Sequence, residues 1–375
     1  MMNSISAKRV WTSGGWLENA KVTISDGKIE KIESGIPESL CDVPLLIPGM
    51  IELHAHGSLG YNSATPSEEE NRAWLRRLAS HGTTAVLPTL SSNPADVICG
   101  AVDFYTKIKK APIEGGAKVL GIHLEGPFLN PEKRGGINPL YLRLPTVEHF
   151  CELVGENRDT VKLITVAPEL CGACELIDHL TKCGISVNAG HTNATAEEMR
   201  RAIGHGLNGV THFFNAARPI THRDPGLLTA ALLDDGVYLE MVSDLVHLAP
   251  EIIHLMVKTA GAKRIAAITD AVKLTGLPDG EYDNDCIVKD GSPRKSNGTL
   301  TGGRYLMDGC ARALIGIGVD PWDVFCMTSY TPAARIGAKG VGDIAVGYSA
   351  DLVAMDDSYQ IIYTVIDGEK NNSKE

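Results

Sequence analysis

The sequence lacks any apolar run long enough to cross a membrane. No window offers the roughly 18 uninterrupted apolar residues of a membrane span, and the first residues, MMNSISAKRVWTSGG, carry charge but no apolar stretch of signal-peptide length. Positive charge is also scarce, since 35 Lys and Arg stand against 46 Asp and Glu, for a net charge of -11. This balance argues against a nucleic-acid partner, although a local basic pocket for a small anion stays open. We therefore expect a cytoplasmic protein that binds neither membrane nor nucleic acid.

A disulfide framework is missing as well. The chain holds nine cysteines, an odd number that fits reduced thiols in an intracellular protein. Cys171 and Cys174 form a CxxC pair with Cys151 and Cys183 nearby, which leaves a structural zinc site as an alternative. Their expected position on outer helices favours ordinary buried thiols.

The two ends of the chain show β-type patterns. Residues 21–25 and 28–32 are short β-type runs joined by the turn-forming Asp26-Gly27, which predicts a small antiparallel unit within residues 1–48. At the other end, DIAVGYSADLVAMD and QIIYTVIDGE return to β-patterning. These C-terminal strands cannot bury a face alone, so residues 1–48 and 341–375 are expected to form one β-sandwich domain.

Between these ends, apolar β-type runs alternate with amphipathic helical stretches, the pattern of a parallel sheet built from βα units. The helical candidates include residues 68–81, 93–110, 146–156, 194–204 and 250–260, and Thr195 with Glu198 gives a capping-box spacing. The eight β-type runs are LLIPGMIELHAH, TTAVLPTL, KVLGIHLEGPF, TVKLITVAPEL, ISVNAGHT, GVTHFFNA, VYLEMVSDLVH and RIAAITDA. They predict an α/β fold, a (β/α)₈ barrel over residues 49–340, with a Gly-rich hairpin inserted near residues 275–303.

Residues of metal-ligand type lie at the ends of these runs. Because residues two apart in a strand face the same side, the two histidines of the first run project together. Barrel enzymes carry their active sites at the carboxyl ends of the strands, so we expect the set to meet there and to hold one or two divalent cations for hydrolysis. His123 shares a face with Glu125 and is expected to orient or pack against the ligands. The candidate ligands are His54, His56, Glu125, His191, His212 and Asp270.

The motifs that carry these residues resemble the N-acetylglucosamine-6-phosphate deacetylases of the amidohydrolase superfamily. They are PGMIELHAHG, HLEGPFLNPEKRGG, NAGHTNA, THFFNAARPITHRDPG, VSDLVH, ITDAV, NGTLTGG and GDIAVGYSADLVAMD. The resemblance implies a metal-bearing barrel, a β-sandwich from both termini and a homodimer. It implies that Glu125, His191 and His212 are ligands, that His54 and His56 belong to a two-metal branch with Glu125 bridging, and that Asp270 is the catalytic carboxylate. Asp270 would take a proton from water and pass it to the leaving amine, with His247 as a possible helper.

The same resemblance implies a site for an amino-sugar phosphate. His247 would contact the phosphate together with Arg223 of the neighbouring subunit, and the backbone amides of Asn215 and Ala216 would bind the same group. The flap over the sugar corresponds to residues 300–302. The full set of implied substrate contacts is Gly136, Asn215, Ala216, Arg223, Asp244, His247, Leu300, Thr301 and Gly302.

Several alternatives stay open. Arg223 could instead pair with Asp224 on an exposed loop. Lys133 with Arg134 is expected to be a solvated pair, with a substrate contact as the alternative. Ile137 stands where the family usually places a polar His or Gln, and Arg218 also departs from the family pattern. N-acetylgalactosamine 6-phosphate is therefore the nearest rival substrate. The ion is expected to be zinc, with iron, manganese or cobalt as alternatives.

Two other classes of protein are disfavoured. Other amidohydrolases that act on different amides often use a carbamylated lysine at the end of the fourth strand, where this chain reads TVAPEL. A protein that only binds sugar phosphates would be expected to have lost a ligand or Asp270, and none is lost.

Overall fold

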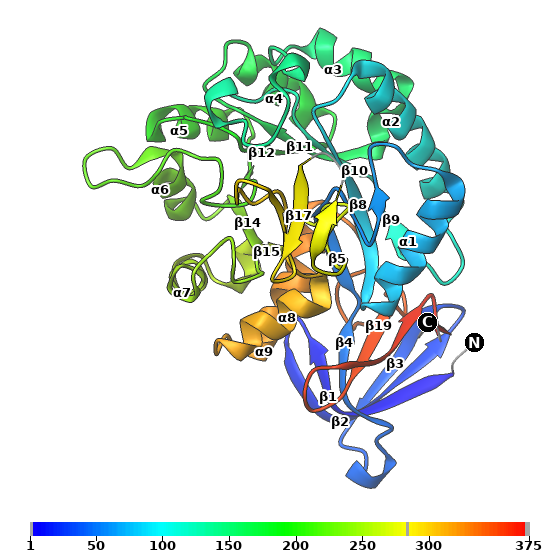
Figure 1. The fold of residues 1–375 in the computed structure, drawn as a ribbon. Coiled ribbons are helices and arrows are strands. Elements are labelled where there is room, and N and C mark those ends of the chain that lie inside the picture. The colour runs from blue at the N-terminus through cyan, green and yellow to red at the C-terminus, as the bar shows by residue number, and fades with distance from the viewer. Residues whose placement is uncertain (1–2, 283–284, 372–375) are drawn as a thin grey trace.

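The computed structural model describes residues 3–282 and 285–371 and has two parts, a barrel and a terminal sheet (Figure 1). Residues 283–284 of the predicted hairpin, and residues 1–2 and 372–375 of the predicted sandwich, lie outside the described residues. Among the helices that the structure describes, none has both the length and the apolar character needed to span a bilayer.

The barrel consists of parallel strands in chain order, which confirms the predicted (β/α)₈ fold. A backbone hydrogen bond of 3.0 Å from Asp270 N to His54 O, beside a parallel bridge between Ala55 and Ala271, joins the last strand to the first. A short extra strand, β9 (Lys118–Val119), pairs with β8. The barrel strands are β5 (Met50–Ala55), β8 (Thr83–Ser91), β10 (Ile122–Glu125), β11 (Val161–Val166), β12 (Ser186–Ala189), β13 (Gly209–Val210), β14 (Tyr238–Val242) and β15 (Ile265–Ile268).

One expected strand proves to be two. The run LLIPGMIELHAH divides at Gly49 into β4 (Val43–Pro48), which belongs to the terminal sheet, and β5, which begins the barrel. A Cβ atom at Gly49 would lie 2.0 Å from Thr84 Oγ1, so only glycine lets the chain pass this close to β8.

Helices cover the outside of the barrel. The strands are buried on both faces, as β5 shows along its whole length, because the helices pack outside and side chains fill the interior. The predicted capping box is confirmed, since Glu198 N donates to Thr195 Oγ1 at 3.2 Å and Thr195 N donates to Glu198 Oε2 at 2.8 Å. The helices are α1 (Glu68–Ser80), α2 (Ala95–Lys110), α3 (Val147–Val154), α4 (Ala173–Lys182), α5 (Ala196–Gly204), α6 (Gly226–Leu233), α7 (Pro250–Ala260), α8 (Met307–Gly316), α9 (Pro321–Phe325) and α10 (Thr331–Arg335).

Strands from both ends of the chain form one seven-stranded sheet in the order β21-β20-β19-β4-β1-β2-β3. The predicted turn at Asp26-Gly27 links β2 to β3, but β4 pairs parallel to β1, so the N-terminal unit is mixed and not purely antiparallel. The segment before β19 lies against the edge strand β3, where Ile29 N donates to Tyr348 O and Ala350 N donates to Gly27 O, both at 2.8 Å. The sheet has its own apolar core, as a sandwich would. The division of the chain at residues 48 and 341 stays a prediction. The strands not yet given are β1 (Ser4–Thr12), β2 (Gly15–Ser25), β3 (Lys28–Ser34), β19 (Leu352–Met355), β20 (Ile361–Ile366) and β21 (Glu369–Asn371).

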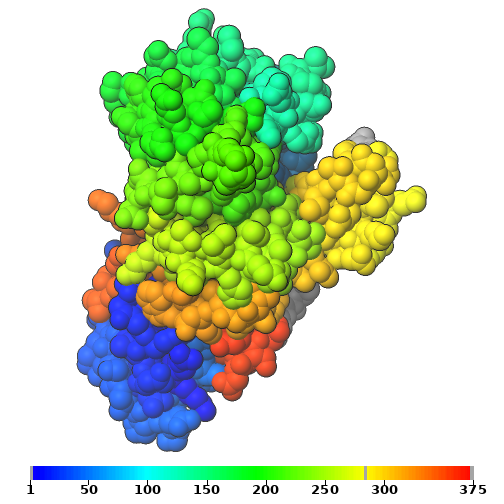
Figure 2. Space-filling model, turned by 90° about the vertical axis from the view of Figure 1, so that its left-hand side faces the viewer, coloured from blue at the N-terminus to red at the C-terminus, as the bar shows by residue number. Residues whose placement is uncertain are grey.

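A small antiparallel sheet is inserted after the last barrel strand. It contains β16 (Gly280–Tyr282), β17 (Cys286–Lys289) and β18 (Ser292–Lys295), so it has one strand more than a hairpin. Figure 2 shows this yellow segment standing out from the body of the molecule. A two-stranded ribbon, β6 (Gly57–Ser58) with β7 (Tyr61–Asn62), follows β5.

Candidate metal centre and substrate pocket

The predicted ligand residues lie together at the carboxyl ends of the barrel strands. His54 and His56 come from the end of β5, and Glu125 is the last residue of β10. His191, His212 and Asp270 lie two residues beyond β12, β13 and β15, with φ angles of 47°, 29° and 50°. Residues other than glycine rarely adopt positive φ, and such strain concentrates at functional sites.

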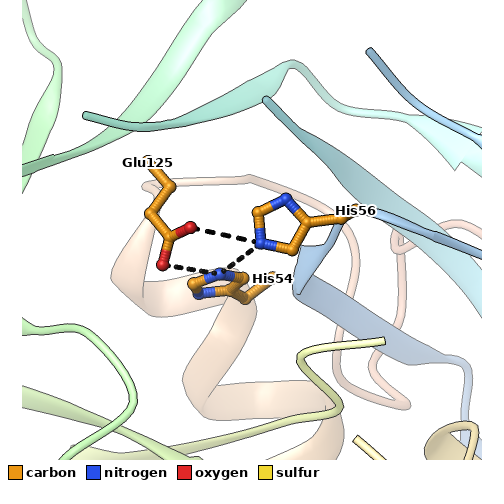
Figure 3. Close-up of side chains that lie close together, drawn as sticks. All are labelled: His54, His56 and Glu125. Carbon is orange, nitrogen blue, oxygen red and sulfur yellow. Dashed lines mark hydrogen bonds and ion pairs between the residues drawn. The ribbon is translucent and has the colours of Figure 1, made fainter. Parts of the chain in front are cut away.

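Glu125 lies at the centre of four histidines. Its Oε1 is 3.4 Å from His54 Nε2 and its Oε2 is 3.3 Å from His56 Nε2 (Figure 3). His191 Nε2 and His212 Nε2 lie 3.1 Å and 3.0 Å from Oε1. Of three groups of candidate ligands among the described residues, two contain Glu125, one with His54 and His56 and one with His191 and His212. The third joins His54 to His123 and Glu240 behind it.

The hydrogen bonds behind the rings fit these groups to a divalent cation. His54 Nδ1 lies 3.0 Å from Glu240 Oε2, and His191 Nδ1 lies 2.8 Å from Lys133 O. Since both oxygens are acceptors, each Nδ1 carries a hydrogen, and Nε2 is the nitrogen that faces Glu125. A proton on Nε2 can bond to the carboxylate, and a divalent cation in its place would bind both the ring nitrogen and the carboxylate oxygen. Histidine and carboxylate together are ligands that divalent metal ions accept.

Charge also favours an ionised Glu125. Burial opposes ionisation, but the charges of His191 and His54 and the hydrogen bonds from the rings outweigh it and hold the pKa of Glu125 well below its usual value. The carboxylate is 4% exposed, so bulk water screens these interactions little. The Glu125 carboxylate is therefore a negative charge at the centre of the four histidines.

Asp270 lies beside the cluster at the edge of the pocket. Its Oδ1 is 3.6 Å from both His54 Nε2 and His56 Nε2, and its side chain is 18% exposed. Its backbone oxygen accepts a 2.8 Å hydrogen bond from Gly303 N. A Cβ at Gly303 would lie 1.8 Å from Thr269 O, so the chain needs glycine to approach the strand this closely. Asp270 is thus fixed between the last strand and the flap.

A cavity of about 960 Å³ opens above the cluster. The inserted segment forms one of its walls, and the bridge between Arg294 and Leu300 connects β18 to the flap. Of the predicted substrate contacts, seven line this cavity: Gly136, Asn215, Ala216, His247, Leu300, Thr301 and Gly302. Ile137 lines it as well. The Asn215 N–H donates to His212 O at 2.9 Å, so that amide is already engaged within its turn.

Asp244 lies behind His247 instead of at the cavity surface. Its Oδ2 accepts hydrogen bonds from His247 Nδ1 at 2.9 Å and from Arg304 N at 3.0 Å. Burial opposes ionisation, but the hydrogen bond and charge of His247 lower the pKa of Asp244 to about 2. Burial likewise works against a charged His247, yet Asp244 raises the pKa of that ring above its usual value. The pair presents His247 Nε2 as a hydrogen-bond donor.

Arg223 does not appear among the described residues that line the cavity. It lies in the exposed loop between β13 and α6, where Asp224 pairs with Arg218. Arg218 Nε donates to Asp224 at 2.9 Å and Nη1 donates to Asn193 O at 3.1 Å. Arg218, one of the two residues that depart from the family pattern, therefore anchors this loop.

The loop charges near Glu125 also hold backbone in place. Lys133 Nζ donates to Ala217 O at 3.3 Å, and Arg134 Nη1 donates to Ile137 O at 2.8 Å. Both side chains therefore bind backbone, and the expectation of a purely solvated pair is wrong.

The alternative of a structural zinc site at the CxxC pair gains no support, because no candidate ligand group in the described part of the chain contains a cysteine. The expectation of buried thiols there is wrong, since Cys151 and Cys171 are exposed and Cys174 and Cys183 are partly buried.

His123 lies beneath the cluster as expected for an orienting or packing residue. Its Nε2 is 2.9 Å from Thr165 Oγ1, its Nδ1 is 3.2 Å from Leu53 O, and its ring meets His54 edge-on with centroids 4.6 Å apart. Burial, with the nearby charge of His54, lowers its pKa to about 3. His123 is therefore neutral, and both nitrogens are occupied.

The sequence reading missed a layer of buried polar residues below the site. Glu52 and Glu240 are each 2% exposed, and Asn188 and Arg335 are 1% and 3% exposed. Burial raises the pKa of Glu52 to about 7 even though the carboxylate accepts hydrogen bonds from His54 N and Thr269 N. A glutamate inside the apolar run VYLEMV was the available signal.

Comparison with known proteins adds a family context. Residues 45–370 match the amidohydrolase family. The chain is 32% identical to an N-acetylgalactosamine-6-phosphate deacetylase of Escherichia coli O157:H7, over 98% of this chain and 99% of the relative. It is also 32% identical to an N-acetylglucosamine-6-phosphate deacetylase of Vibrio furnissii, over 96% of this chain and 93% of the relative.

Solved structures agree in fold. A mutant N-acetyl-D-glucosamine-6-phosphate deacetylase of Mycobacterium smegmatis, in complex with N-acetyl-D-glucosamine-6-phosphate, is 28% identical with a TM-score of 0.92, and 99% of each chain is covered. The N-acetylglucosamine-6-phosphate deacetylase of Thermotoga maritima is 30% identical with a TM-score of 0.89, over 98% of this chain and 99% of that one.

Proposed function

The chain belongs to the amidohydrolase family, and on that basis we propose that it hydrolyses the acetamide of an N-acetylhexosamine 6-phosphate, releasing acetate and the free amine. The family resemblance inferred from the motifs is confirmed. The observation that carries the proposal is the meeting of the ligand-type residues, Asp270 and His247 around one cavity. N-acetylglucosamine 6-phosphate is the first candidate substrate.

We propose that two divalent cations bind around Glu125. His54 and His56 would hold one ion, His191 and His212 the other, and Glu125 would contact both. Zinc is the first candidate, and iron, manganese and cobalt, which accept the same ligands, are the alternatives. A bound ion would supply a water whose pKa is about 7 and would polarise the acetamide carbonyl.

Asp270 is proposed as the residue that moves the proton. Its carboxylate would accept a proton from the attacking water and return it to the amine nitrogen as the C–N bond breaks, because an unprotonated amine leaves poorly. Water adds its oxygen to the acetyl carbon and its hydrogens to the two products, so atoms balance. The position of Asp270 at the cavity edge, 3.6 Å from His54 and His56, supports this role.

The phosphate group is proposed to bind near His247. This ring would donate a hydrogen bond to the phosphate, helped by the backbone amide of Ala216, whereas the amide predicted at Asn215 already donates to His212 O. In a homodimer, Arg223 of the partner subunit would complete the contact. The exposed position of the loop and its anchoring by Arg218 support a contact made between subunits.

The sugar epimer is the open choice within this proposal. Ile137 brings an apolar side chain to the cavity where the family usually places a hydrogen-bonding one. One relative named for the galactosamine substrate is 32% identical over nearly the whole chain, and this supports N-acetylgalactosamine 6-phosphate as the second candidate. A cytoplasmic location stays a prediction.

Acetate release from a matched panel of sugars tests the proposal. Metal-loaded protein should release acetate from N-acetylglucosamine 6-phosphate or its galactosamine epimer and far more slowly from the same sugars without phosphate. Equal rates on both forms would refute the phosphate site. Inactivity on the whole panel would point to another amide substrate.

A further inference from the structure

Glu240 lies inside the barrel, one layer below the candidate metal centre. It comes from the middle of β14, is 2% exposed, and directs its two oxygens to different partners. Oε2 is 3.0 Å from His54 Nδ1, and Oε1 is 2.7 Å from Asn188 Nδ2. Glu240 therefore touches the back of a candidate ligand and not the cavity.

A chain of hydrogen bonds continues from Glu240 to the opposite end of the barrel. Asn188 Oδ1 accepts a 2.7 Å hydrogen bond from Nη2 of Arg335, which is the last residue of α10 and is 3% exposed. Arg335 Nη1 also donates to Asn208 Oδ1 at 2.8 Å. The path is thus Arg335, Asn188, Glu240 and then His54.

Gly209 on β13 makes room for this chain. A Cβ atom there would lie 2.0 Å from Asn188 Oδ1 and 2.6 Å from Arg335 Nη2. Any larger residue would displace the link between the guanidinium and the amide. The glycine at position 209 therefore leaves the space that the hydrogen bond between Arg335 and Asn188 needs.

The two charges at the ends of the chain need one another. A buried carboxylate or guanidinium is unfavourable unless it is paired and hydrogen-bonded, and Asn188 connects the two through its amide. Glu240 Oε1 already accepts from Asn188 Nδ2, and the guanidinium of Arg335 on the far side of that amide favours a negative carboxylate. An ionised carboxylate only accepts hydrogen bonds, so His54 Nδ1 must donate.

This requirement decides which nitrogen of His54 can bind an ion. With hydrogen on Nδ1, the neutral ring keeps a lone pair on Nε2, which lies 3.4 Å from Glu125 Oε1 and 3.3 Å from His56 Nε2. The other tautomer would place hydrogen on Nε2 and remove a ligand from the group. Residues behind a metal ligand often fix the tautomer and ring orientation in this way.

We infer that Glu240, paired with Arg335 through Asn188, is a positioning residue that commits His54 Nε2 to a divalent cation shared with His56 and Glu125. The inference rests on the proposed function, in which the chain binds two metal ions. It is nevertheless tested by ion binding alone, without any substrate.

The test is a zinc titration of chelator-stripped full-length protein against a competing zinc dye. Glu240→Gln keeps the shape of the side chain but removes its charge. It should lower the affinity for one of the two zinc ions by roughly 10–100-fold. The other ion should keep its affinity. His54→Ala and His212→Ala identify which ion is which, and the Glu240→Gln loss should coincide with the His54→Ala loss.

Further variants separate positioning from general damage. Arg335→Met should lower the affinity for the same zinc ion, and Arg335→Lys should keep part of that affinity. Asp308→Asn removes another buried carboxylate, on α8 and 3.2 Å from His81, and should leave both zinc ions unchanged. Thermal midpoints of the stripped proteins report any loss of folding separately.

The inference is overturned if Glu240→Gln binds both ions with wild-type affinity, or if it weakens both equally. It is also overturned if the wild-type chain binds a single ion that survives His54→Ala. A protein that shows the selective loss yet deacetylates no sugar would support this inference and refute the proposed substrate.

Discussion

Asp270 donates its backbone N–H to the carbonyl oxygen of His54 across 3.0 Å. The bond joins the last barrel strand to the first, next to the bridge between Ala55 and Ala271. The proposed proton carrier and a proposed metal ligand are therefore positioned by the same closure of the barrel. Gly303 N adds a 2.8 Å hydrogen bond to Asp270 O, which ties the flap to this point.

Asp270→Asn should lower kcat by roughly 10²–10⁴-fold, because an amide of the same shape cannot accept the proton from water. The backbone bonds of Asp270 do not involve its side chain, so the fold should be unchanged. The measurement is acetate release together with metal content by elemental analysis. Retained turnover at wild-type metal content would remove Asp270 from the proposed role.

His54→Ala should release one of two metal ions and leave the other with Glu125, His191 and His212. The substitution removes a nitrogen 3.4 Å from Glu125 Oε1, whereas the other pair of rings lies at 3.1 Å and 3.0 Å from it. Elemental analysis after dialysis gives the count per chain. His205→Ala is the control, because its ring pairs with Asp178 on the surface, and it should keep both ions. An unchanged count in His54→Ala contradicts the two-metal proposal.

The pair of Asp244 and His247 should make stability depend on pH in a defined window. The pKa of Asp244 is lowered to about 2 in the folded protein, so its contribution is complete above its unfolded pKa of about 3.9 and is lost as pH falls through 2. The pKa of His247 is raised above 6.5, so the contribution of the charged ring is complete below 6.5 and is lost as pH rises through its folded pKa. The pair therefore contributes most between about pH 4 and 6.5.

Asp244→Asn should accordingly reduce the free energy of unfolding by about 2 kcal/mol in that window. Urea unfolding of metal-stripped wild type and variant, measured from pH 2 to 8, gives the difference. Stripping the metal from both proteins keeps ligand protonation out of the comparison. A difference that stays constant down to pH 2 would contradict a lowered pKa of Asp244.

The periodic parts of the sequence predicted the barrel and the position of its site. Alternating βα units require strand ends to meet at one edge, so His191, His212 and Asp270 could be placed together without coordinates. The closing turn at Asp26-Gly27 was equally readable, since its residues favour positive φ. Both features depend only on residues close together in the chain, so they can be predicted from the sequence.

Contacts between distant segments could not be read in the same way. Nothing near Arg335 in the sequence signals that its guanidinium reaches Asn188, 147 residues away. The parallel pairing of β1 with β4 and the division at Gly49 likewise depend on which neighbour the chain meets in space. Arg218 was noticed as unusual, but its bond to Asp224 follows only from the shape of the loop.

Mixing two inactive variants should test whether Arg223 acts across a dimer. Asp270→Asn lacks the proton carrier, and Arg223→Gln lacks the proposed phosphate contact. In a mixed dimer, one site would combine the intact Asp270 of the Arg223→Gln chain with the intact Arg223 of the Asp270→Asn chain. Unfolding and refolding the two together at equal amounts gives half mixed dimers, each with one complete site, so about a quarter of wild-type activity should return. Separately refolded proteins combined just before the assay are the control. If co-refolding restores no activity above that control while size-exclusion chromatography shows dimers, Arg223 does not act between subunits.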